Sequence, residues 1–144
     1  MQFIRIIIVD DHEMVREGLK LSLQEEPDFC VVGEASSGAG LIKLMETTTA
    51  DVILLDERLP EDNGINICAR LTKRYPDVKI IIITAYAEQK NLISRAIMAG
   101  AKGFLIKNVQ LLELKRAIRT VARGNTILDP QATTHLIDCF KEIS

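Results

Sequence analysis

The chain has 144 residues, of which 47% are hydrophobic and 26% are charged, and its formal net charge is −2. At roughly 150 residues per domain, this length predicts one globular unit with a sizeable core. The composition is too apolar for a disordered chain, and the slight acidic excess without tryptophan argues against a nucleic-acid-binding surface.

Five short runs rich in β-branched residues are typical of strands: Phe3 to Val9, Phe29 to Val32, Asp51 to Leu55, Val78 to Ile83 and Gly103 to Ile106. They are apolar almost without alternation, which indicates strands covered on both faces and therefore a buried parallel sheet. Segments with helical spacing separate them, as at Val15, Leu19 and Leu23. This order predicts right-handed βαβ units and a (βα)5 α/β fold with a doubly wound parallel sheet of five strands.

The pattern changes after Gly124. Residues Asn125 to Pro130 predict a turn or linker, and Gln131 to Ile143 predict one more amphipathic helix. This tail is too short to form a domain of its own.

The compartment is inferred from the cysteines and from the apolar runs. Cys30, Cys68 and Cys139 are odd in number, far apart and embedded in apolar runs, which favours buried reduced thiols over disulfides or metal ligands. The N-terminus lacks a signal-peptide core, and no apolar run approaches the length of a membrane span. We therefore expect a cytoplasmic protein without membrane association.

Polar side chains follow four of the five predicted strands. Asp10 and Asp11 end the first, Asp56 the third, Thr84 the fourth and Lys107 the fifth. Taken singly, each is explained as a helix cap or a solvated charge. Because ligand sites of open α/β sheets lie beyond the carboxyl ends of the strands, the five together indicate one shared site.

The charges of this site indicate its chemistry. If the first and third strands are neighbours, Asp10, Asp11 and Asp56 lie so close that ionising all three requires a cation. Carboxylate oxygens match Mg²⁺, whereas zinc would require a cysteine or histidine cluster. With Mg²⁺ and Lys107 to offset charge, Asp56 becomes a candidate nucleophile for a phosphoryl group.

These residues lead to a family resemblance. From about Ile4 through Ala122 the chain resembles the receiver domain of bacterial two-component response regulators, in the acidic pair, the Asp56 loop (DERLPEDNG), Thr84 followed by alanine, and the run GFLIK that ends at Lys107. The resemblance implies a flavodoxin-like, CheY-like sheet with strand order 2-1-3-4-5. It also implies that the chain is not an enzyme beyond self-catalysed phosphotransfer and autodephosphorylation.

A finer resemblance is to the NarL/FixJ (LuxR-type) subfamily, carried by DDHEMVREGL from Asp10 and by GNTILDP from Gly124. It implies a receiver domain over residues 1–123 and a linker with a short helix over 124–144, leading toward a helix-turn-helix DNA-binding domain that this sequence lacks. The linker-like tail favours excision from a longer transcription regulator over a natural stand-alone receiver.

Roles are carried over by position. Asp56 would accept the phosphoryl group of a sensor histidine kinase, and Asp10, Asp11, Asp56 and the backbone carbonyl of Arg58 would hold Mg²⁺, Asp10 through a water molecule. Thr84 and Lys107 would contact the phosphoryl oxygens. Movement of Thr84 and rotation of Phe104 would then switch the domain's surface and promote a phosphorylation-dependent homodimer. DNA would be contacted only through the absent domain.

Several residues depart from the pattern or invite other readings. Glu57 places a charge directly after the phosphoacceptor, and the alternation of a strand favours a side chain that points away from the site. His12 is predicted to be an exposed first-turn residue. Glu34, at the end of the second strand, has no obvious partner. The basic residues near the C-terminal end of the last receiver helix are interpreted as a solvated face: Lys115, Arg116, Arg119 and Arg123.

Two alternatives remain open. One is a receiver-like interaction module that is never phosphorylated, which Glu57 supports. The other is a phosphatase that uses an aspartate after its first strand, although such hydrolases usually carry D-x-D where this chain has Asp10-Asp11-His12.

Overall fold

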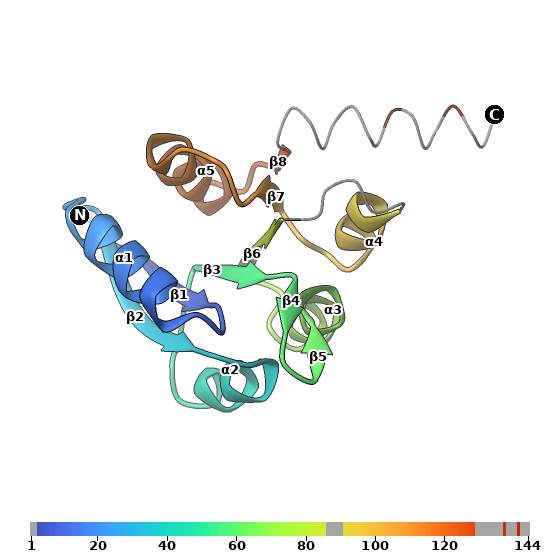
Figure 1. The fold of residues 1–144 in the computed structure, drawn as a ribbon, viewed down its shortest axis with the longest axis horizontal. Helices are drawn as coiled ribbons and strands as arrows, with labels where there is room; N and C mark the ends of the chain where they lie inside the picture. The colour runs from blue at the N-terminus through green and yellow to red at the C-terminus, as the bar shows by residue number, and fades with distance from the viewer. Residues whose placement is uncertain (1–2, 86–90, 129–136, 138–140, 142–144) are drawn as a thin grey trace.

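The computed structural model describes residues 3–85, 91–128, 137 and 141, and Figure 1 shows its fold. Five parallel strands are joined by helices in the predicted alternation. The strands are β1 (Ile4–Val9), β2 (Phe29–Ala35), β3 (Val52–Asp56), β6 (Lys79–Thr84) and β7 (Gly103–Ile106), and the helices are α1 (Glu13–Gln24), α2 (Gly38–Met45), α3 (Gly64–Arg74), α4 (Leu92–Met98) and α5 (Leu111–Ala122).

The sheet has one more strand than predicted. Its order is β2-β1-β3-β6-β7-β8, and every neighbouring pair is parallel. The first five positions confirm the order 2-1-3-4-5. The sixth, β8 (Ile127–Leu128), lies in the stretch predicted to be a turn or linker and pairs with Gly103 and Phe104 of β7. Two residues are too few to produce a strand pattern in a sequence.

Helices cover both faces of the sheet (Figure 1). On one face Ile7, Ile53 and Ile80 belong to a core with residues of α2, α3 and α4. On the other, Ile6 and Ile81 pack with residues of α1 and α5. This two-sided burial explains why the strands are apolar without alternation. No helix among the described residues is long and apolar enough to cross a membrane.

The cysteine prediction holds in part. Cys68 is buried in α3, and burial raises the pKa of its thiol to about 12. Cys30 is exposed, contrary to expectation, because β2 is an edge strand. Cys139 lies outside the described residues.

The basic residues of α5 were predicted to be solvated, and for Lys115 and Arg119 this is wrong. Lys115 donates to Glu26 at 3.1 Å, and Arg119 donates to Glu26 at 2.6 Å and to Asp28 at 2.9 Å. The Arg119 guanidinium also lies 4.6 Å from the ring centre of Phe29. These contacts tie α5 to the α1–β2 connection, some 90 residues earlier in the chain. Arg116 and Arg123 are exposed, as predicted.

We expect Arg119→Met to lower the melting temperature at pH 7 by on the order of a few degrees. Hydrogen bonds from Arg119 hold the pKa of Glu26 and the pKa of Asp28 below their ordinary values. Carboxylates with a depressed folded-state pKa stabilise the fold above about pH 4.5, and this contribution is lost as the pH falls further. Thermal melts from pH 7 to pH 3 should therefore show a shrinking difference from the wild type.

Arg116→Met is the matched control, because its i,i+3 pair with Glu113 is exposed on both sides and such pairs contribute little. An Arg119→Met difference that does not depend on pH would show that its packing, and not its ion pairs, stabilises the fold.

Candidate functional site

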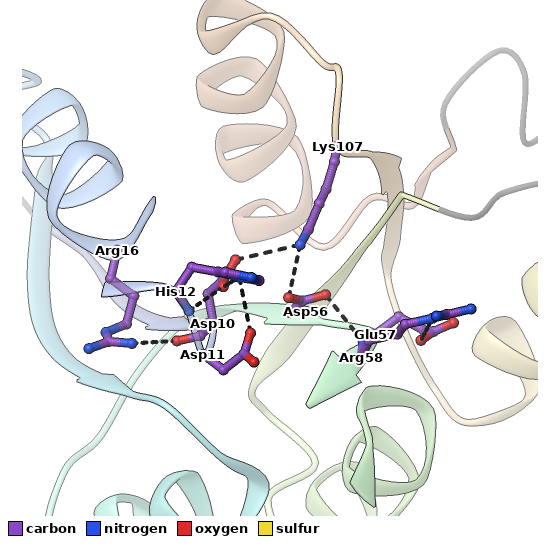
Figure 2. Close-up of polar contacts among 8 residues, drawn as sticks. All are labelled: Asp10, Asp11, His12, Arg16, Asp56, Glu57, Arg58 and Lys107. Carbon is purple, nitrogen blue, oxygen red and sulfur yellow. Dashed lines mark hydrogen bonds and ion pairs between the residues drawn. The ribbon is translucent and has the colours of Figure 1, made fainter. Parts of the chain in front are cut away.

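The polar residues predicted to share a site meet at the carboxyl edge of the sheet (Figure 2). Asp10 and Asp11 directly follow β1, and Asp56 is the last residue of β3. Lys107 follows β7 in the same way. These strands are adjacent or separated only by β6, so the parallel topology brings the four side chains to one place.

Two of the carboxylates are buried. The side chains of Asp10 and Asp56 are 7% and 4% exposed, whereas that of Asp11 is 35% exposed. The Lys107 ammonium lies 3.0 Å from Asp56 Oδ2 and 3.8 Å from Asp10 Oδ2. Lys107 thus offsets part of a concentrated negative charge.

The electrostatics of the site appear in two pKa shifts, both of them upward. Burial raises the pKa of Asp56, although hydrogen bonds from Lys107 and from the Arg58 backbone N–H oppose this. Burial by itself lowers the pKa of Lys107, but the hydrogen bond to Asp56 and the nearby carboxylates outweigh it, so the pKa of Lys107 is raised. Lys107 is therefore a permanent cation beside a carboxylate whose charge is poorly solvated.

The loop after Asp56 is held by backbone contacts. The Arg58 N–H donates to Asp56 Oδ1 at 3.2 Å, and the Glu57 N–H donates to the Ile83 carbonyl at 2.9 Å. Two short strands, β4 (Arg58–Leu59) and β5 (Asp62–Asn63), pair antiparallel and lead into α3, where the Gly64 N–H donates to the Glu57 carbonyl. The phosphoacceptor candidate therefore sits at the start of a fixed loop.

Glu57 points away from the carboxylate cluster, as the strand alternation predicts (Figure 2). Its side chain is 7% exposed, lies 3.9 Å from the Arg58 guanidinium and lines a groove together with Arg95 of α4. Burial raises the pKa of Glu57. The charge after the phosphoacceptor is thus directed toward α4 and does not join the cluster.

Thr84 and Phe104 lie on one face of the sheet. Thr84 ends β6 and is 1% exposed, and its carbonyl accepts from the Lys107 N–H at 2.8 Å. Phe104 of β7 is also 1% exposed and pairs in register with Ile82, two residues before Thr84. Residues two apart share a face of a sheet, so Thr84 lies on the Phe104 side, and the ring is packed into the core.

Two contacts around Asp10 were not predicted. His12 is exposed, as expected, yet its Nδ1 lies 2.7 Å from Asp10 Oδ1 and 3.0 Å from Asp11 Oδ1. Arg16 donates to the Asp10 carbonyl at 2.6 Å and to Glu34 at 3.2 Å, so Glu34 has a partner after all. The sequence offered one indication of these two contacts, because His12 and Arg16 are one helical turn apart at the start of α1.

The donor set fits a hard divalent cation. One ligand atom from each of Asp10, Asp11, His12 and Asp56 lies within 4.8 Å of the others, and three of these atoms are carboxylate oxygens. Oxygen donors of this kind are what Mg²⁺ requires, and no thiol joins the group within the described part of the chain. Acidic side chains at this density also need a cation to remain ionised together.

Comparison with known proteins decides the family. The model of the response regulator receiver domain matches residues 6–119. The chain belongs to the response regulator receiver family. Its relatives include the DNA-binding transcriptional activator DevR/DosR of Mycobacterium tuberculosis, 40% identical over 93% of this chain and 61% of the relative. Another is the transcriptional regulatory protein DegU of Brevibacillus brevis, 34% identical over 97% of this chain and 59% of the relative.

Solved receiver structures share the fold. A LuxR-family two-component response regulator from Aurantimonas is 28% identical, with a TM-score of 0.88 over 99% of this chain and all of that one. The receiver domain of the putative response regulator NarL from Mycobacterium tuberculosis is 30% identical, with a TM-score of 0.81 over 87% of this chain and all of that one. The NarL/LuxR-type assignment is thereby confirmed. The chain spans about 60% of the length of these curated relatives.

Proposed function

We propose that this receiver is a phosphorylation-operated switch in which Asp56 takes a phosphoryl group from the phosphohistidine of a sensor histidine kinase. The observation that carries the proposal is the convergence of a buried Asp56 carboxylate, a Lys107 ammonium at 3.0 Å and the acidic pair at one sheet edge. An isolated buried carboxylate would be a liability for stability, whereas this arrangement suits a phosphoryl group.

The proposed reaction is a simple displacement. An Asp56 carboxylate oxygen attacks phosphorus, the new O–P bond forms, and the N–P bond of the phosphohistidine breaks to release the imidazole. Lys107 offsets charge on the phosphoryl oxygens, and the Thr84 hydroxyl donates to one of them. Asp10, Asp11, Asp56 and the Arg58 carbonyl would hold Mg²⁺, which when bound supplies positive charge beside the phosphoryl group.

The kinase needs a surface next to Asp56. A cavity of about 290 Å³ between α1 and α5 reaches Asp10, Asp56 and Lys107 and is otherwise lined mainly by apolar side chains, including Val15, Leu19 and Leu111. We propose that a helix of the kinase approaches over this side, and that the encounter takes place in the cytoplasm. A histidine from such a helix would then face the Asp56 carboxylate.

The switch is proposed to run through Thr84 and Phe104. Attraction of Thr84 to the phosphoryl group would change the packing beside Phe104 and remodel the surface of α4, β7 and α5. The extent of this population shift is bounded by the difference in phosphoryl binding between the two conformers.

We propose a division into a receiver over residues 1–123 and a linker with a short helix over 124–144. The relatives that are named transcriptional regulators support DNA binding through a further domain, with the receiver controlling it. Exposed apolar side chains on α1, α4 and α5, among them Met14, Met98 and Leu112, support a homodimer formed on phosphorylation.

The two alternatives predict different chemistry. A phosphorylation-independent module would form no adduct at Asp56, although Glu57, the residue that favoured it, points away from the site. A phosphatase would release phosphate steadily from varied organic phosphates. We propose instead that the chain catalyses only its own phosphorylation and dephosphorylation.

Incubation with acetyl phosphate and Mg²⁺ should add one phosphoryl group to the intact mass of the chain, and EDTA should prevent it. Reduction with borohydride followed by peptide mass mapping should place the adduct at Asp56. Light scattering on the same sample should report a dimer.

An adduct on another residue would overturn the assignment of Asp56. No adduct under any metal condition would favour the phosphorylation-independent module, and turnover of organic phosphates without an adduct would favour the hydrolase. A phosphorylated monomer would remove the dimer from the proposal.

A further inference from the structure

His12 lies beside the acidic pair, directly before the first residue of α1. It is the N-cap residue of α1, yet its side chain forms no cap hydrogen bond with the helix. Its Nδ1 instead lies between carboxylate oxygens of Asp10 and Asp11, and Figure 2 shows the ring over these two residues. The imidazole is therefore part of the carboxylate cluster.

The distances from His12 Nδ1 to the two carboxylate oxygens are compatible with ligands around one ion. In an octahedral site with bonds of about 2.1 Å, adjacent ligand atoms are about 3.0 Å apart. His12 Nδ1 lies 2.7 Å from Asp10 Oδ1 and 3.0 Å from Asp11 Oδ1, and these residues and Asp56 contribute ligand atoms that all lie within 4.8 Å of one another. The His12 nitrogen is thus already spaced from the Asp10 and Asp11 oxygens as two ligands of one ion would be.

We infer that His12 is a direct ligand of the metal site, so that this receiver binds first-row transition ions such as Mn²⁺ and Co²⁺ through a mixed nitrogen and oxygen set. Imidazole suits these ions, whereas Mg²⁺ takes oxygen ligands. His12 therefore strengthens the binding of Mn²⁺ and Co²⁺ and leaves that of Mg²⁺ to the carboxylates. The inference rests on the proposed function, because it concerns the metal of the same site.

A His12 ring that does not touch the metal leads to a different prediction. If the ring only donates a hydrogen bond to Asp10, it orients that carboxylate equally for every divalent ion. Replacing His12 would then weaken the binding of Mg²⁺ and of Mn²⁺ to the same degree, and no nitrogen would touch the metal.

The first test is spectroscopic. The chain is loaded with Mn²⁺ alone, and electron spin echo envelope modulation is recorded for the wild type, His12→Gln and His135→Gln. The sequence contains two histidines, so His135→Gln is the matched control. We expect an imidazole nitrogen coupling in the wild type and in His135→Gln and its loss in His12→Gln.

The second test compares affinities by calorimetric titration with Mn²⁺, Co²⁺ and Mg²⁺ in turn. His12→Gln should weaken Mn²⁺ and Co²⁺ by about tenfold or more and change Mg²⁺ by less than about twofold. Absence of nitrogen coupling in Mn²⁺-loaded wild type, or an equal loss for all three ions, would overturn the inference.

Acetyl phosphate separates this inference from the proposed function. A wild-type chain that forms the Asp56 adduct with Mg²⁺ but shows no nitrogen coupling with Mn²⁺ refutes the role of His12 alone. A chain that shows the coupling but never forms the adduct keeps the metal ligand and refutes the phosphoacceptor.

Discussion

Asp56→Asn is expected to abolish the phosphoryl adduct completely and, without divalent metal, to raise the free energy of unfolding. The adduct is lost because the substitution removes the nucleophile. The second effect follows from burial, because the Asp56 side chain is 4% exposed and shares its surroundings with the Asp10 carboxylate.

The sign of the stability effect follows from the pKa of Asp56. Burial raises that pKa, so at neutral pH the ionised carboxylate is less favourable in the folded chain than in the unfolded one. The penalty is present above the unfolded-state pKa of about 3.9, and asparagine removes it. In the variant, Lys107 still has the Asp10 carboxylate as a neighbour at 3.8 Å. Its side chain is 34% exposed, so the ammonium remains both paired and solvated.

Urea unfolding at pH 7 in EDTA and in Mg²⁺ measures both consequences. Mg²⁺ at about 100 times its Kd should stabilise the wild type by about 2.7 kcal/mol and the variant much less. Asp51→Asn is the control at the opposite edge of the sheet, where burial acts against the Asp51 charge but hydrogen bonds from Arg5 lower the pKa of Asp51. Asp51→Asn should destabilise the chain. An Asp56→Asn variant less stable than wild type in EDTA would contradict the account.

The shared site was predictable because the strands of a parallel sheet have their carboxyl ends at the same edge. Once the runs ending at Val9, Leu55 and Ile83 are read as buried strands, topology alone brings Asp10, Asp56 and the residue after Ile83 to one edge. The end of a strand follows from its apolar run, and no side-chain coordinates are needed to place it.

The contacts that the sequence did not reveal depend on the directions in which side chains point from their helices. Arg119 meets Glu26 and Asp28 because α5 lies beside the connection between α1 and β2. His12 turns back onto Asp10 and Asp11 instead of capping its helix. A helical repeat shows which residues are polar, but it does not show which of them meet a partner 91 residues away. Lys115 and Arg119 were assigned to solvent for this reason.

Gly64→Ala is expected to destabilise the fold by about 2 to 3 kcal/mol and to slow phosphorylation by acetyl phosphate at least about tenfold. A Cβ at position 64 would clash with the Asp56 backbone carbonyl oxygen and would lie 3.0 Å from Glu57 Cα. Both obstacles are backbone atoms, so rotating a side chain cannot relieve the clash. The loop that presents Asp56 must move, and with it the carboxylate that Lys107 and the Arg58 N–H hold.

Gly18→Ala provides the matched control for this substitution. Gly18 lies on the exposed face of α1, and a Cβ there would meet no heavy atom within 4 Å. Alanine should therefore stabilise α1 by about 0.5 to 1 kcal/mol and leave phosphorylation unchanged. Urea unfolding and the rate of adduct formation measure both variants. A Gly64→Ala chain that is phosphorylated at the wild-type rate would show that the close approach of α3 to Asp56 does not position the phosphoacceptor.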